Sequence, residues 1–180
     1  MQKICYTSLK QTALIALVGI LIVAFAVGIF VWLLTIEPPF FDEESQVGMP
    51  QEVPKEKGFS YFNEADVCAA YLCQNPDFDG KNVDLFFTSP EENEGYFIRV
   101  EIYTVDYLYD ENGKKTGTTL GDLLGKSGFI RPGEYVQTVH LTKKVKEQTF
   151  VALKVGVYEE ATGKNRGSML IPIYLTPPMN

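Results

Sequence analysis

Apolar and polar residues alternate with a period of two over several stretches after residue 80. The stretch 96–105 reads YFIRVEIYTV and places Ile98, Val100 and Ile102 on one side of an extended segment. Successive side chains of a β-strand point to opposite faces, so this pattern predicts a strand with one buried face. The same alternation predicts strands at 82–87, 149–158 and 169–175, with these residues facing inward: Val83, Leu85, Phe87, Val151, Leu153, Val155, Val157, Met169, Ile171, Ile173 and Leu175.

Shorter strands are predicted at 67–73, 103–109 and 134–142. Pro172 interrupts the last long strand, and because proline cannot donate to a sheet, it predicts an edge position. The segment from Leu120 to Leu124 is predicted to form a single helical turn. Short strands separated by turns favour an antiparallel β-sandwich. The predicted turns are Asp79-Gly80, Glu94-Gly95, Asn112-Gly113, Pro132-Gly133 and Thr162-Gly163.

A run of 24 residues, Ala13 to Ile36, contains no charged side chain. A helix of this length reaches about 36 Å, which is enough to cross a hydrocarbon core of about 30 Å. Lys3 and Lys10 precede the run, whereas acidic residues follow it. Because positive flanks stay on the inner side of a membrane, we expect residues 1–12 to be a cytoplasmic tail and 13–36 to be one transmembrane helix, a signal anchor.

A cleaved signal peptide is the alternative interpretation of this run. Ala24-Phe25-Ala26 is a small-residue pattern of the kind that signal peptidases cut. The apolar run, however, continues for ten residues beyond Ala26, which such a site does not normally tolerate. The sequence therefore favours an uncleaved anchor that leaves the rest of the chain outside the cell membrane.

Residues 37–57 contain four prolines and many acidic side chains, and they show neither a helix nor a strand period. This composition predicts a linker between the membrane and the folded part. Residues 58–180 are long enough for one domain. After Ile36 the chain holds 14 basic and 23 acidic residues, a net charge of −9. A domain this acidic is expected to repel nucleic acid and anionic lipid surfaces.

Several stretches together are similar to a known type of module. DGKNV at 79–83 and NEGYFIRVEIY at 93–103 are followed by SGFIRPGEYV at 127–136 and by GSM at 167–169. This combination resembles small membrane-anchored modules of Gram-positive bacteria. The resemblance extends over most of the domain and implies an immunoglobulin-like sandwich of the cell envelope with no assigned function. The chain departs from the pattern at 107–125, where a longer insertion replaces a short hairpin.

The sequence gives no catalytic motif. His140 is the single histidine and falls on the outward side of its strand, and no G-x-S-x-G nucleophile motif occurs. The chain resembles sortases in combining an N-terminal anchor with a β domain that contains a cysteine and a histidine. In those enzymes, however, the histidine precedes the cysteine. Here Cys68 and Cys73 precede His140. We therefore expect a domain that is not an enzyme and uses no cofactor or metal.

The cysteines are expected to be thiols. Five extended residues would separate the Cα atoms of Cys68 and Cys73 by about 16 Å, whereas a disulfide needs less than about 7 Å. Cys5 falls in the predicted cytoplasmic tail. The segment 75–84 is rich in oxygen ligands, but Phe86 stands where a calcium loop needs a bidentate glutamate. A solvated Asp-Gly turn is therefore the favoured interpretation of this segment, and a weak calcium site is the alternative.

Aromatic residues are frequent, with ten tyrosines and twelve phenylalanines. Phe86, Tyr103, Tyr107 and Tyr109 are predicted to point outward and to form a candidate binding surface, although aromatic side chains also serve core packing. Two functions stay open. The first is an anchored interaction module that binds another envelope or surface protein. The second is recognition of a cell-wall or surface glycan by exposed tyrosines and carboxylates.

Overall fold

The computed structural model describes residues 14, 17–28, 40–53, 55–64 and 68–177. Its contacts divide the chain into two units, residues 1–38 and 39–180. In the first unit, residues 17–28 are helical. Among the described residues, no helix is both long and apolar enough to cross a bilayer. The predicted tail 1–12 with Cys5 and both ends of the predicted span 13–36 lie outside the described residues.

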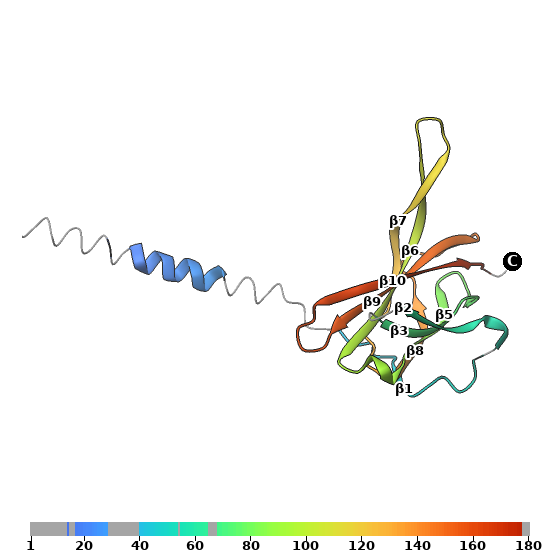
Figure 1. The fold of residues 1–180 in the computed structure, drawn as a ribbon, viewed down its shortest axis with the longest axis horizontal. Helices are drawn as coiled ribbons and strands as arrows, with labels where there is room; N and C mark the ends of the chain where they lie inside the picture. Colours follow the sequence, from blue (N-terminus) through green and yellow to red (C-terminus); the bar gives the residue numbers. More distant parts are fainter. Residues whose placement is uncertain (1–13, 15–16, 29–39, 54, 65–67, 178–180) are drawn as a thin grey trace, which may run out of the picture. The chain divides into compact units, whose positions relative to one another are not determined.

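The second unit contains two antiparallel sheets (Figure 1). One sheet has the strand order β1-β8-β5-β3-β2, with β4 paired to β5, and the other has the order β10-β9-β6-β7. The strands are β1 (Gln46–Val47), β2 (Phe59–Glu64), β3 (Cys68–Cys73), β4 (Asp77–Phe78), β5 (Asn82–Ser89), β6 (Tyr96–Tyr109), β7 (Lys115–Lys126), β8 (Glu134–His140), β9 (Thr149–Glu159) and β10 (Asn165–Leu175). Two short 3₁₀ helices, η1 (Lys55–Lys57) and η2 (Glu91–Asn93), lie between strands.

One hydrophobic core lies between the two sheets. Ile98 and Val100 of β6 meet Leu85 and Phe87 of β5 in the same buried cluster. All the positions predicted to face inward in β5, β6, β9 and β10 belong to this cluster. Each such side chain stabilises the fold by about 1.5–3 kcal/mol through its removal from water. The two packed antiparallel sheets agree with the predicted β-sandwich.

Pro172 lies on an edge strand, as the sequence predicts. β10 pairs only with β9 in its sheet, and Pro172 lies opposite Ala152. An edge strand leaves part of its backbone unpaired, so the missing N–H of proline costs no hydrogen bond within the sheet.

The region 107–125 forms a long hairpin that Figure 1 shows extending beyond the rest of its sheet. The predicted strands 96–105 and 103–109 are one continuous strand, β6. The predicted helical turn from Leu120 to Leu124 is wrong, because these residues belong to β7 and pair with β6. The tip is the predicted turn: Gly113 has φ +74°, and Asp110 Oδ1 accepts hydrogen bonds from two backbone N–H groups.

Part of the predicted linker 37–57 packs on the β unit. Phe41 forms a parallel bridge with Phe129, and the Phe129 N–H donates to the Phe40 carbonyl oxygen at 2.8 Å. The side chain of Asp42 accepts a hydrogen bond from the Gly128 N–H at 2.7 Å. Further along, β1 pairs with the start of β8. These described residues therefore form part of the fold and not a free spacer.

Candidate binding surfaces

The outer face of the sheet β10-β9-β6-β7 carries a row of apolar side chains that crosses all four strands. Tyr103 of β6 lies opposite both Leu123 of β7 and Ala152 of β9. Ala152 in turn lies opposite Pro172 of β10. Directly opposed residues point to the same face of a sheet, so the four side chains form one continuous row.

Further apolar side chains flank this row. Phe150 lies opposite Tyr174, and their ring centroids are 4.9 Å apart. Leu170 and Tyr174 are 56% and 57% exposed, and Leu123 is 41% exposed. Exposed apolar groups gathered in this way mark interaction sites more often than scattered ones do. We call the following set the apolar face: Tyr103, Leu123, Phe150, Ala152, Leu170, Pro172 and Tyr174.

A charged cluster borders the apolar face. Glu101 is only 8% exposed although it points to the outer side of β6. Its carboxylate accepts hydrogen bonds from Arg99 at 2.6 Å, from the Tyr103 hydroxyl at 3.0 Å and from Lys154 at 3.3 Å. Burial raises the pKa of Glu101, but the two cations and the hydroxyl outweigh it and hold this pKa below its ordinary value. The Glu101 carboxylate is therefore ionised at neutral pH.

Aromatic rings fix the position of Arg99. Its guanidinium carbon lies 5.0 Å from the ring centre of Phe129 and 5.2 Å from that of Tyr158, and it donates a hydrogen bond to the Tyr158 hydroxyl. Phe129 also packs against Phe41 of the N-terminal segment. The charged cluster is thus held by groups from three separate parts of the chain.

The four aromatic residues predicted as a binding surface lie on two different faces. Tyr103, Tyr107 and Tyr109 alternate along β6 and therefore share one side of that strand. Tyr107 and Tyr109 are exposed on the hairpin, where Lys115 Nζ lies 3.7 Å from the Tyr107 ring centre. Phe86 belongs to the other sheet. The prediction missed the β9 and β10 members of the apolar face, although their alternation with inward residues was a usable signal.

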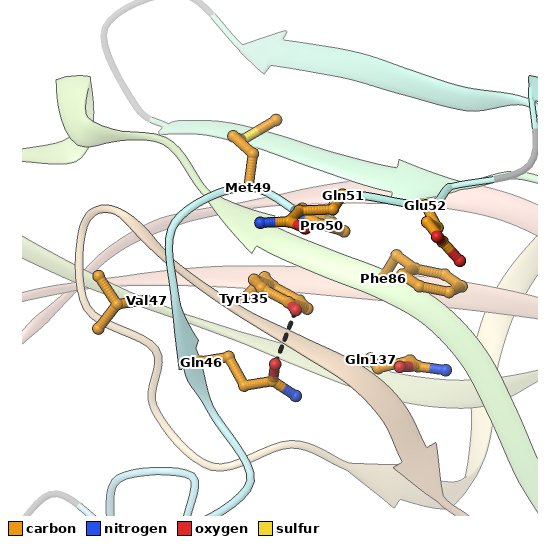
Figure 2. Close-up of a pocket in the computed structure, with 9 residues that line it drawn as sticks. All are labelled: Gln46, Val47, Met49, Pro50, Gln51, Glu52, Phe86, Tyr135 and Gln137. Carbon is orange, nitrogen blue, oxygen red and sulfur yellow. Dashed lines mark hydrogen bonds between the residues drawn. The ribbon is translucent and has the colours of Figure 1, made fainter.

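Phe86 lines a pocket of about 540 Å³ on the outer side of the other sheet (Figure 2). The floor comes from Phe86 of β5 and from Tyr135 and Gln137 of β8. The opposite wall is the segment 46–52, which pairs with β8 at β1 and then leaves it. The Tyr135 hydroxyl donates to Gln46 Oε1 at 2.8 Å and joins the wall to the floor. The full lining is Gln46, Val47, Met49, Pro50, Gln51, Glu52, Phe86, Tyr135 and Gln137.

The predicted calcium segment 75–84 is held by protein contacts. Asp79 accepts hydrogen bonds from the backbone N–H groups of Asn82 and Lys81 and from the Asn82 amide, which lower the pKa of Asp79. Asp77 forms an ion pair with Lys57. Over the described part of the chain, no three His, Cys, Asp or Glu side chains are grouped to hold a metal ion.

Cys68 and Cys73 are free and buried, as predicted. Cys68 belongs to the core cluster. Cys73 is an odd number of residues further along β3, so its side chain points to the other face of the strand. Burial raises the pKa of both thiols to about 11. His140 is exposed, and its Nδ1 lies 2.7 Å from Asn82 Oδ1 and its Nε2 3.5 Å from a Glu44 carboxylate oxygen.

Comparison with known proteins identifies no relative. No protein-family model matches the chain, and neither the curated proteins nor the solved structures contain a match.

Proposed function

We propose that this protein is a single-pass membrane protein whose β domain lies outside the cytoplasm and binds another surface protein without catalysing a reaction. The observation that supports this function best is the apolar face. It crosses a complete sheet, ends at an edge strand and includes Leu170 and Tyr174, each more than half exposed. Water-exposed apolar surface of this kind is costly unless a partner covers it.

The composition of this face suits a protein partner. Two tyrosines lie on it, and Arg99 lies at its border, and tyrosine and arginine are the residue types enriched where protein interfaces gain most of their energy. Glu101 pairs with both Arg99 and Lys154, so its carboxylate would not be desolvated without a partner beside the apolar row. The edge strand β10 adds free backbone groups with which an extended segment of a partner could pair.

The membrane location rests on the apolar run 13–36 and its charged flanks. Protease added to intact cells is expected to digest residues 39–180 of the full-length protein. A domain that resists digestion in intact cells, yet is cut once the membrane is opened, would place it on the inner side.

The strand order supports the proposal of an immunoglobulin-like fold. β3, β5 and β8 are neighbours in one sheet, which also contains β1, β2 and β4, while β6, β9 and β10 belong to the other, and β7 extends the second sheet beside β6. Immunoglobulin sandwiches divide strands A, B and E from C, F and G in the same sequence order. The proposed kinship with envelope modules of Gram-positive bacteria rests on this order and on the turn motifs.

Substitutions on the apolar face test the proposed function. Leu170→Asp and Tyr174→Asp put a charge on the face of an edge strand, where the fold tolerates it but an apolar interface does not. Proteins co-purified with the full-length chain from its own membranes are expected to be lost with both variants. Tyr61→Asp, at an exposed tyrosine on β2 of the other sheet, is the matched control and should retain them. Identical co-purified proteins in all variants would contradict the proposal.

A further inference from the structure

The pocket beneath the segment 46–52 is lined by amide and carboxylate side chains, which the apolar face does not contain. Its floor and wall come from different elements: β5 and β8 on one side, and the segment that follows β1 on the other (Figure 2). Its volume of about 540 Å³ falls within the range of small-molecule sites. The pocket lies on the opposite sheet from the apolar face, so one chain could use both surfaces.

The backbone at Phe86 is strained. Phe86 has φ +49° and is the one residue other than glycine with a positive φ in the described part of the chain. A bulky residue rarely adopts this conformation, because its side chain crowds the backbone. The pairing of β5 with β8 shifts register between Asp84 and Phe87. Such a bulge redirects a side chain, and here it presents the Phe86 ring to the pocket beside Gln137.

The polar groups of the pocket are neutral amides and one carboxylate. Gln46, Gln51 and Gln137 each offer a donor and an acceptor, and Glu52 accepts only. Within the described residues, Gln51, Glu52 and Gln137 make no side-chain hydrogen bond, so these groups are free to bind a ligand. The lining contains no lysine, arginine or histidine. A phosphate or carboxylate ligand would therefore meet a negative charge and no cation.

From these features we propose that the pocket binds one or two neutral sugar units of a glycan. A pyranose ring has apolar C–H faces that pack on aromatic rings, here Phe86 and Tyr135, and hydroxyl groups that both donate and accept. The carboxamides match that dual capacity, and the carboxylate of Glu52 accepts from two hydroxyls at once. The aromatic rings, the carboxamides and the absence of cations in the lining all suit the same ligand class.

A titration of the full-length protein with sugars tests the proposal. The protein is held in a zwitterionic detergent, because a detergent with a sugar headgroup would compete. The probes are triacetylchitotriose and maltotriose as neutral oligosaccharides, and a heparin-derived disaccharide as the charged comparison. Side-chain amide resonances of Gln46, Gln51 and Gln137 report on the pocket. A saturable shift of these signals with a neutral probe, and none with the charged probe, is the expected result.

Two variants separate binding from folding. Phe86→Gly removes the ring and relieves the strained φ, so the fold is retained while affinity for the sugar is expected to fall about tenfold or more. Gln137→Ala changes an exposed side chain and should also weaken binding. Gln148→Ala, at an exposed glutamine outside the pocket, is the control and should bind normally. Absence of any shift with both neutral probes, or equal binding by Phe86→Gly and the unchanged protein, would overturn the proposal.

Discussion

Single side chains decide how the charged cluster beside the apolar face behaves. Glu101, which is largely shielded from water, forms ion pairs with both Arg99 and Lys154. Removing Glu101 would leave two partly exposed cations without their carboxylate partner. The cluster therefore makes this side of the domain sensitive to acid.

Glu101→Gln is expected to lower the free energy of unfolding by about 1 kcal/mol at neutral pH, because the two cations with which Glu101 pairs are partly exposed. Because the folded-state pKa of Glu101 is below its ordinary value of 4.5, its contribution is present above that value and is lost as the pH falls through the lowered pKa. Urea unfolding measured from pH 7 downward should show the unchanged protein and the variant converging below pH 4.5. A difference that stays constant to the lowest pH would contradict this account.

The two buried thiols are expected to be unreactive. With pKa values of about 11, about one thiol in a thousand is ionised at pH 8, and both residues are buried. In a Cys5→Ser background, iodoacetamide should label neither Cys68 nor Cys73 in the folded protein and both in urea. Rapid labelling of the folded protein would contradict the burial of the thiols. Labelling in urea only after reduction would show that they are not free.

At the scale of elements, the N-terminal segment depends on close backbone contact. A Cβ atom added at Gly128 would lie 2.4 Å from the Asp42 backbone nitrogen and 2.6 Å from its Cα. These are backbone atoms that cannot rotate away, so Gly128→Ala must displace residues 40–42.

Gly128→Ala is therefore expected to destabilise the protein by about 2 kcal/mol and to speed hydrogen exchange at the Phe129 amide, which donates to Phe40. Gly117→Ala is the control, since the nearest atom to a Cβ there is a side-chain carbon at 3.8 Å. Unchanged exchange at Phe129 in the Gly128 variant would mean that the segment is not held as described.

Elements with regular alternation could be predicted from the sequence, and irregular ones could not. β5, β6, β9 and β10 have one apolar face against the core, which a period of two reveals. β7 reads KTGTTLGDLLGK and shifts register three times against β6, so its pattern resembles a loop. β2 was missed because it is an exposed edge strand, and β1 because two paired residues leave no period.

At the scale of the molecule, the sequence pattern likewise predicts only part of the candidate surfaces. Alternation along β6 was enough to place Tyr103, Tyr107 and Tyr109 on one side. It could not show that Leu170 and Tyr174 join Tyr103, because strand neighbours in a sheet are set by tertiary pairing. The pocket at Phe86 depends on a bulge and on a segment from elsewhere in the sequence, and neither has a local signal.

The domain as a whole thus presents two chemically different outer surfaces. One sheet exposes the apolar face with its charged border, and the other carries a pocket of amides and aromatic rings. A protein with this arrangement could hold a protein partner on one side and a glycan on the other. The protein-binding role of the apolar face is the claim on which the account chiefly depends.

Photo-crosslinking in intact cells tests that claim most directly. A photoreactive phenylalanine derivative replaces Leu170 in one full-length variant and Tyr61 in a second, and the cells are irradiated. The account predicts a discrete adduct with one surface protein from position 170 and none from position 61. No adduct from position 170, or the same adducts from both positions, would contradict it.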